Sequence, residues 1–398
     1  MLREEIAIET IPVGPLGIIA LKGCEEMAGK VDAYLSSWRR DRDSEHKGSL
    51  ALSGYEKDSY LVKAEAARFG SGEGKGIIRE TVRGKDIFIL VDVCNNSIQY
   101  KMSGHMNRMS PDDHFQDLKR VIGAMCGKAR RITVIMPFLY ESRQHRRTGR
   151  ESLDCALGLE ELYDMGVENI ITFDAHDPRV INCAPLAGFE NVKPSYQFLK
   201  YLCKNVKGLK FDKDHMLMIS PDEGAMERSV FYSSVLGINM GMFYKRRDYS
   251  VIVDGTNPII AHEYLGQDIN GKDVIIVDDM ISSGGSMLDT ARAVKDRGAN
   301  NVFIFSTFGL FTNGMEKFDK AYEEGVFTKL LTTNLTYQSP ELLERSYYVS
   351  VDMSKYVAYI IDSLNHDTSI SDLLEPSKKM RSLVENYYAG RIRYEGKD

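Results

Sequence analysis

Residues 274–287 read VIIVDDMISSGGSM, which is a short apolar run followed by two acids and then by serines and glycines. A β-branched run of this length is typical of a buried strand. The serines and glycines predict a turn that opens a helix, with Ser286 as its N-cap and Asp289 three residues further on. Backbone N–H groups and the helix dipole favour an anion at such a turn. The stretch therefore predicts an α/β unit with a phosphate site, beside which the two acids can accept hydrogen bonds from sugar hydroxyls.

The rest of the chain repeats the strand part of this pattern. Helix-period segments lie between several of the strands, and one opens with the N-cap pattern Ser110-Pro111-Asp112-Asp113, with Gly127 as its expected C-cap. Strand–helix alternation predicts α/β units with parallel sheets. Apart from the first stretch, the apolar runs that predict strands are Ile87–Val91, Ile132–Met136, Ile170–Phe173, Met216–Ile219, Met240–Phe243, Val302–Phe305 and Lys329–Leu331.

Three polar segments lack this alternation. Residues 36–59 are rich in Ser, Arg, Asp and Lys, which predicts a loop or an inserted segment. Residues 101–111 are predicted to be a flexible connection. The tail after Pro376 is charged and is predicted to be partly helical.

Composition and charge exclude several classes of protein. The 398 residues predict two domains, perhaps three, and 43% hydrophobic residues exclude disorder of the whole chain. A net charge of −6 disfavours binding to nucleic acid by bulk charge. Six cysteines without CxxC spacing indicate neither a zinc site nor a disulfide framework. An acidic N-terminus and the lack of an apolar run of about 18 residues predict a soluble cytoplasmic protein without a membrane partner.

Five consecutive predicted strands end in ionisable or phosphate-binding residues. Ligands of open α/β sheets bind beyond the carboxyl ends of the strands. Taken singly, each segment has a plain structural explanation, such as a solvated basic face, a structural histidine or a surface hairpin. Their common position favours a ligand site instead. The segments are Arg143–Arg147, Asp174–His176, Ser220–Gly224, Lys245–Arg247 and Asp278–Ser286.

The first stretch resembles the phosphoribosyl-pyrophosphate (PRPP) binding motif of phosphoribosyltransferases and PRPP synthetases. Other segments resemble synthetase motifs in the family's order, over roughly residues 65–335. Arg68–Glu73 is similar to Arg-Phe-Ser-Asp-Gly-Glu, Arg143–Arg147 to Arg-Gln-Asp-Arg-Lys, Asp174–His176 to Asp-Leu-His, Ser220–Gly224 to Ser-Pro-Asp-Xaa-Gly and Lys245–Arg247 to Lys-Arg-Arg. The chain is thereby identified as a divergent member of the ribose-phosphate pyrophosphokinase family.

The resemblance implies an α/β fold with two similar phosphoribosyltransferase-like domains, each a mainly parallel sheet flanked by helices. It implies an ATP-binding domain over residues 1–190, a ribose-5-phosphate-binding domain over residues 191–364 and an extension over residues 365–398. Family members assemble as hexamers or other oligomers, so the resemblance also implies a homo-oligomer, a hexamer or smaller.

The implied reaction transfers the β,γ-diphosphoryl group of ATP to O1 of ribose 5-phosphate, giving PRPP and AMP, with Mg²⁺. Catalysis would fall to Lys245, Arg247 and His176. ATP binding would fall to Phe69, Glu73, Arg143 and Gln144. Ribose 5-phosphate would be held by Asp278, Asp279, Ser282, Ser283, Gly284, Gly285 and Ser286, and the metal by His176 and Asp222.

Three departures from the family pattern keep other functions open. Ser71 and His145 stand where the family has acids, and Ser282 where it often has aspartate. A non-catalytic regulatory subunit of a synthetase assembly would tolerate such changes, although Lys245 and His176 remain. A phosphoribosyltransferase would share residues 274–287 but would not need a second α/β domain.

Overall fold

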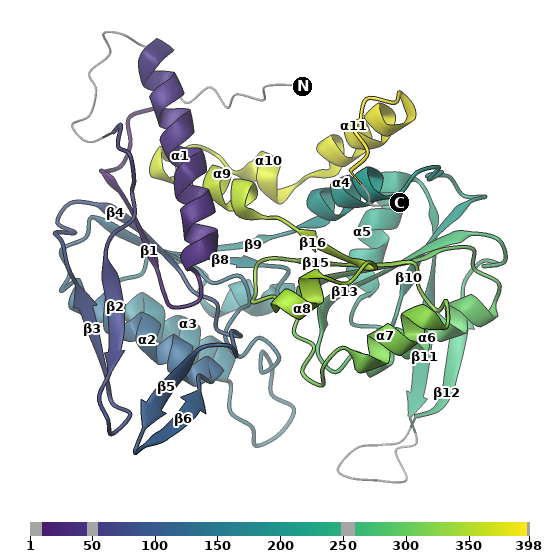
Figure 1. Cartoon of the computed structure of the whole chain (residues 1–398), viewed down its shortest axis with the longest axis horizontal. Helices are drawn as coiled ribbons and strands as arrows, with labels where there is room; N and C mark the ends of the chain where they lie inside the picture. Colours follow the sequence, from purple (N-terminus) through teal and green to yellow (C-terminus); the bar gives the residue numbers. More distant parts are fainter. Residues whose placement is uncertain (1–9, 46–54, 248–258, 396–398) are drawn as a thin grey trace. The chain divides into compact units, whose positions relative to one another are not determined.

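The computed structural model of the chain describes residues 10–45, 55–247 and 259–395 (Figure 1). Of residues 43–45, 245–247 and 259–262 it describes the backbone alone. The chain forms two compact units. Unit 1 comprises Met1–Lys193, Leu335–Tyr337 and Asp352–Glu375, and unit 2 comprises Pro194–Asn334, Gln338–Val351 and Pro376–Asp398.

Unit 1 is built on a five-stranded sheet in the order β1-β4-β7-β8-β9, in which all neighbouring strands are parallel. Figure 1 shows α1 and α9 on one side of this sheet and α2 and α3 on the other. Since helices cover both faces, the strands other than β9 at the sheet edge are mostly buried apolar runs without alternation. The strands are β1 (Leu16–Ala20), β4 (Asp86–Leu90), β7 (Arg131–Ile135), β8 (Asn169–Phe173) and β9 (Gly188–Val192).

The other elements of unit 1 are helices and two hairpins. The helices are α1 (Glu25–Glu45), α2 (Pro111–Ala124), α3 (Asp154–Asp164), α9 (Ser354–Asn365), α10 (Ser371–Leu374) and the 3₁₀ helix η1 (Pro178–Cys183). The hairpins are β2 (Ala64–Arg68) with β3 (Gly74–Ile78), and β5 (Gln99–Met102) with β6 (His105–Arg108).

Unit 2 is built on a seven-stranded sheet in the order β12-β11-β10-β13-β14-β15-β16. All pairs are parallel except β11 with β12 at the edge. The strands are β10 (Met216–Ser220), β11 (Asn239–Arg247), β12 (Ile259–Leu265), β13 (Asp273–Ile281), β14 (Val302–Gly309), β15 (Lys329–Thr333) and β16 (Tyr348–Val351). The helices are α4 (Ser195–Asn205), α5 (Met226–Leu236), α6 (Gly285–Asp296), α7 (Glu316–Glu323), α8 (Pro340–Leu343) and α11 (Ser377–Tyr388).

The α/β class and the predicted strands are confirmed, because each predicted run coincides with a strand of one of the two large sheets. The predicted start of α2 is also confirmed. Ser110 Oγ accepts a hydrogen bond from Asp113 N at 3.2 Å, and the Asp113 carboxylate accepts one from Ser110 N at 3.0 Å. Helix α11 confirms the partly helical tail. The C-cap of α2 is Met125, so the expectation for Gly127 is wrong by two residues.

Two predicted irregular segments are regular instead. Residues 36–45 continue helix α1, and residues 46–54 of that predicted loop lie outside the described residues. The helix buries Val31, Leu35 and Arg39 at a spacing of four, and the charge of Arg39 hides this pattern. Residues 101–108 belong to the β5–β6 hairpin, whose turn residues Ser103 and Gly104 have φ of +50° and +89°. Positive φ at both positions is typical of a two-residue hairpin turn.

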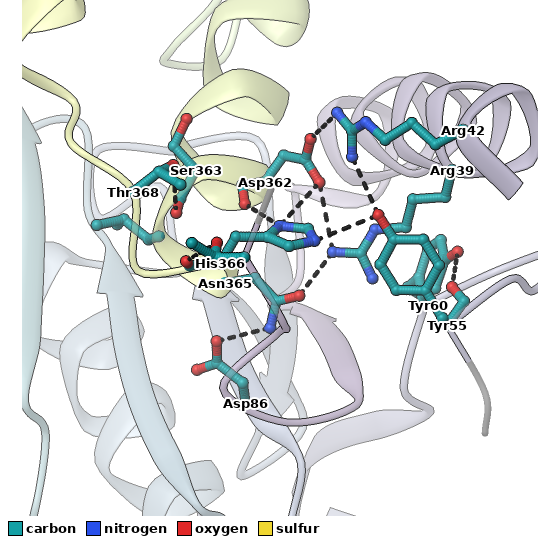
Figure 2. A network of polar contacts seen from close by, with 12 residues as sticks. Arg39, Arg42, Tyr55, Tyr60, Asp86, Asp362, Ser363, Asn365, His366 and Thr368 are labelled. Carbon is teal, nitrogen blue, oxygen red and sulfur yellow. Dashed lines mark hydrogen bonds and ion pairs between the residues drawn. The ribbon is translucent and has the colours of Figure 1, made fainter. Parts of the chain in front are cut away.

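A buried polar network holds α9 in unit 1 (Figure 2). Arg39 is 1% exposed and donates to Asn365 Oδ1 at 2.6 Å, and it lies 3.4 Å from Asp362 Oδ1. Arg42 pairs with the other oxygen of Asp362, and Asn365 donates to Asp86 Oδ2 at 2.8 Å. Helix α9 therefore packs with unit 1, which departs from the expectation that residues 352–364 belong to the second domain.

Candidate active site

The residues predicted to bind ribose 5-phosphate lie at the end of β13, in the turn that follows it and in the first turn of α6. Gly284 precedes α6 with a φ of +81°, and a Cβ there would lie 2.4 Å from the ring of Phe318. Glycine is therefore required at this position, both by backbone conformation and by space. The turn places the N-terminus of a 12-residue helix beside exposed Ser283 and Ser286. This geometry can bind a phosphate group.

The predicted N-cap of α6 is wrong. Gly284 occupies that position, and Ser286 is the second residue of the helix, with no side-chain cap. The reason is the left-handed conformation that the tight turn imposes, which a serine adopts only at a cost. The hydroxyl of Ser286 is thus not used in capping the helix.

Two adjacent acids lie in β13, shortly before the strand ends at Ile281. Asp279 is buried, Asp278 is half-buried, and Asp279 N donates to Asp278 Oδ1 at 2.9 Å. Burial, followed by repulsion from Asp279, raises the pKa of Asp278 well above its usual range. Arg228 Nη2 lies 3.9 Å from Asp279 Oδ2 and partly offsets this charge. Burying two adjacent carboxylates lowers the stability of the fold, which is typical of groups that bind a ligand.

Arg228 was missed in the sequence, where nothing distinguishes it from other polar residues of α5. Its position follows from strand order, because β10 adjoins β13 and α5 follows β10. The turn between β10 and α5 is held by Asp222, whose Oδ1 accepts from Gly224 N at 3.0 Å and Ala225 N at 3.3 Å. Asp222 also adds to the negative field at Asp278.

Lys245 and Arg247 lie at the end of β11, the neighbour of β10, and their backbones pair with His262 and Ile259 of β12. The structure thus places the predicted catalytic strand in the same sheet as the acid pair, in the order β11-β10-β13. The basic side chains themselves lie outside the described atoms.

The ends of β7 and β8 carry the predicted ATP-binding loop and His176. These strands are parallel neighbours, so their carboxyl ends meet at one edge. Glu141, in the segment after β7, and Asp174, the first residue after β8, have φ of +50° and +42°. A non-glycine residue in this region is strained, and such strain is concentrated at functional sites. Gln144 lies in the first turn, where its side chain donates to Ser152 O at 2.8 Å.

A side-chain contact joins the segments that follow β7 and β8. His145 Nε2 lies 3.1 Å from Asp177 Oδ2, and the His145 ring lies edge-on to His176 with 5.6 Å between ring centroids. Arg179 binds the Asp177 carboxylate and lowers the pKa of Asp177 to about 2. Asp177 was missed in the sequence. The dipeptide Asp177-Pro178 is a typical helix start, and Asp177 is indeed the N-cap of η1.

Phe69 and Glu73 lie on the β2–β3 hairpin and not on the main sheet. Phe69 is 55% exposed, and its N–H donates to Glu73 O at 2.8 Å. Ser71, between them, donates its hydroxyl to the Glu73 carboxylate at 2.8 Å. An exposed phenylalanine on a hairpin tip can stack on a flat ligand ring.

The six cysteines are free thiols, in agreement with the absence of a disulfide framework from the sequence pattern. None of the described helices has the length and apolar character needed to cross a membrane.

Two family models match the chain. The N-terminal domain of ribose phosphate pyrophosphokinase matches residues 16–166, and the phosphoribosyl transferase domain matches residues 197–345. Together they cover about three quarters of the chain. The chain belongs to the ribose-phosphate pyrophosphokinase family. The two matched regions contain β1, β4 and β7 of the first sheet and β10–β15 of the second, and all the predicted site residues except His176 lie inside them.

Individual pyrophosphokinases are similar to this member at low identity. The ribose-phosphate pyrophosphokinase of Vibrio cholerae is 28% identical over 316 residues, which are 78% of this chain and 90% of the relative. That of Ralstonia nicotianae is 29% identical over 67% of this chain and 78% of the relative. The solved phosphoribosylpyrophosphate synthetase of Mycobacterium smegmatis covers 89% of this chain and 99% of its own, with 20% identity and a TM-score of 0.65. The last likeness supports the fold.

Proposed function

We propose that this chain is a ribose-phosphate diphosphokinase, which transfers the β,γ-diphosphoryl group of ATP to O1 of ribose 5-phosphate for nucleotide biosynthesis. The observation that carries the proposal is the β13–α6 turn, where an acid pair adjoins a glycine-constrained phosphate turn, inside a chain matched by both family models. In this reaction O1 attacks the β-phosphorus, the bond from that phosphorus to the α-phosphate oxygen breaks, AMP leaves, and the O1 proton is released.

Ribose 5-phosphate is the ligand of the β13–α6 turn in this proposal. The 5-phosphate binds the N–H groups and hydroxyls of Ser282–Ser286, and Asp278 and Asp279 accept hydrogen bonds from the ribose hydroxyls. Arg228 limits the repulsion between the acids before the sugar binds. Lys245 and Arg247 close over the transferring group and stabilise its charge.

ATP is the ligand of unit 1 in this proposal. Arg143 and Gln144 contact the nucleotide, Phe69 stacks on adenine with Glu73 beside it, and His176 faces the phosphates. The supporting observation is the common edge formed by the ends of β7 and β8. Unit 1 would thus be the ATP-binding part and unit 2 the ribose-5-phosphate-binding part of the chain.

Magnesium is the proposed cofactor. Among the described residues no group of three His, Cys, Asp or Glu side chains is arranged to hold a metal alone. Mg²⁺ in phosphoryl-transfer sites is held by one or two carboxylates together with substrate phosphates, and Asp222, Asp278 and Asp279 supply oxygen ligands of this kind. His176 is also a proposed metal ligand. When bound, the ion neutralises the charge of the triphosphate.

The resemblance also supports a homo-oligomer, a hexamer or smaller, that acts in the cytoplasm with ATP and ribose 5-phosphate as its partners. Sedimentation at micromolar concentration tests the assembly, and a monomer at all concentrations would contradict it.

The test of the function is AMP and PRPP formation from ATP, ribose 5-phosphate and Mg²⁺ without a nucleobase. A phosphoribosyltransferase would release no AMP in this assay. A regulatory subunit, which the residues at positions 71, 145 and 282 would allow, would bind ATP without turnover.

A further inference from the structure

The turns after β7 and β8 are joined by a histidine–aspartate contact that neither predicted motif contains. His145 Nε2 lies 3.1 Å from Asp177 Oδ2, and the two side chains are only 12% and 10% exposed. Burying the Asp177 carboxylate costs free energy unless it has polar partners. The contact with His145 therefore belongs to the folded structure of this sheet edge.

Both residues are themselves held in place. Asp177 accepts from Arg179 Nε at 2.9 Å and from Arg179 N at 2.9 Å. On the other side, His145 Nδ1 lies 3.1 Å from Ser142 O, which is also an acceptor. The imidazole therefore has an oxygen partner at each nitrogen, one from each turn, and its orientation is determined.

His176 lies directly before Asp177 and against the His145 ring, at 5.6 Å and an interplanar angle of 61°. The turn that carries it starts at the strained residue Asp174, and Ala175 N is held by Asn191 Oδ1 at 2.9 Å. The turn is thus anchored on one side by β9 and on the other by the histidine–aspartate contact. Strained turns keep their conformation only when such contacts over-determine it.

We infer that His145 and Asp177 form a bridge that positions His176 for diphosphoryl transfer. The inference rests on the proposed function and makes His145 a positioning residue. It also gives His145 a role in an active enzyme, although the family has an aspartate at this position. An aspartate at position 145 would face the Asp177 carboxylate, and two close carboxylates repel each other.

Four variants separate the bridge from a general packing role. His145→Asn keeps a donor for Ser142 O but does not reach Asp177, whereas His145→Gln can still donate to Asp177. His145→Asp introduces repulsion, and the double variant His145→Asp with Asp177→Ala removes it. The matched control is His215→Asn. It changes an exposed histidine, just before the start of β10, whose Nδ1 lies 2.7 Å from Asp212 Oδ1.

The measurements are kcat and KM for PRPP formation with Mg²⁺, together with the Tm of each variant. We expect His145→Asn to lower kcat roughly 10- to 100-fold with little change in KM for ribose 5-phosphate. His145→Gln should recover most of kcat, His145→Asp should be the least active, and the double variant should exceed it. The control should match the wild type.

A wild-type kcat for His145→Asn, or losses of kcat that simply follow Tm in all variants, would overturn the bridge. An inactive wild-type protein would instead overturn the proposed function itself, so the two failures are distinguishable.

Discussion

At the scale of single residues, the acid pair of β13 lowers the stability of the fold at neutral pH, and in the proposed function the same two carboxylates bind the sugar. Burial and its neighbour raise the pKa of Asp278, so the folded state disfavours the ionised form, and stability is lost as pH rises through that pKa. We expect Asp278→Asn to increase the free energy of unfolding at pH 7.5 by about 1 kcal/mol. PRPP formation should fall by at least about 100-fold, because a hydrogen-bond acceptor for the sugar is lost.

Urea denaturation and the AMP-release assay measure the two effects. Asp289→Asn, at an exposed position of α6, is the control and should change neither. A destabilised Asp278→Asn protein would show that the carboxylate supports the fold.

The basic end of β11 gives a second prediction at this scale. We expect Lys245→Ala to lower kcat by about 1000-fold, since the cation proposed to stabilise the transferring phosphates is removed, while Tm stays within about 2 °C. Lys213→Ala, at an exposed position before β10, is the matched control. Unchanged turnover of Lys245→Ala would exclude this lysine from catalysis.

At the scale of elements, the turn into α6 offers two neighbouring glycines with different surroundings. Alanine at position 284 would meet the Phe318 ring at 2.4 Å in a left-handed conformation, whereas alanine at position 285 would meet nothing within 4 Å. We expect Gly284→Ala to cost about 1–3 kcal/mol of stability and to raise KM for ribose 5-phosphate, and Gly285→Ala to keep its Tm. Equal Tm values for the two variants would contradict the role of the turn.

The contact between α1 and α9 gives a prediction about buried charge (Figure 2). Asp362→Ala leaves Arg39, which is 1% exposed, without its carboxylate partner. We expect a loss of about 3–5 kcal/mol in the free energy of unfolding, measured in urea. Asp367→Ala, which removes an exposed partner of Arg131, is the control and should cost less than about 1 kcal/mol.

The same network makes stability depend on pH. Burial lowers the pKa of His366, and the hydrogen bond from Arg42, with the nearby Arg39, outweighs burial and lowers the pKa of Asp362. Both folded-state pKa values lie below the unfolded ones, so the stability from each group is present above its unfolded pKa and is lost as pH falls. We therefore expect Tm to fall as pH drops below about 6.5 and again below about 4. His366→Gln should weaken the first step only.

At the scale of the whole molecule, the reactivity of the six cysteine thiols measures whether the chain is folded. Cys126 and Cys183 are exposed, Cys94 is half-buried, and the other three are buried with raised pKa values. We expect two thiols to react quickly with a thiol reagent in the native protein and six in denaturant, because the reagent reaches only exposed thiols until the chain unfolds. Reducing agent should leave Tm unchanged, and a shift would indicate a disulfide.

The sequence alone determined the α/β class, the principal strands and the segments that follow them. This was possible because buried strands are apolar runs and because glycines and acids after a strand carry local information. The resemblance to family motifs then predicted PRPP chemistry at residues 274–287. Hairpin β5–β6 was not predicted, because methionines interrupt its strand pattern. The C-terminal half of α1 was not predicted, because the buried Arg39 interrupts its apolar face.

Only the tertiary structure decided which distant residues meet. Arg228 reaches the acid pair because β10 and β13 are neighbours, and Asp177 reaches His145 because β7 and β8 are neighbours. Asn365 meets Arg39 across more than 300 residues of chain. Such contacts depend on strand order and helix packing, which bring side chains together at hydrogen-bonding distance, and no local pattern of residues encodes that distance.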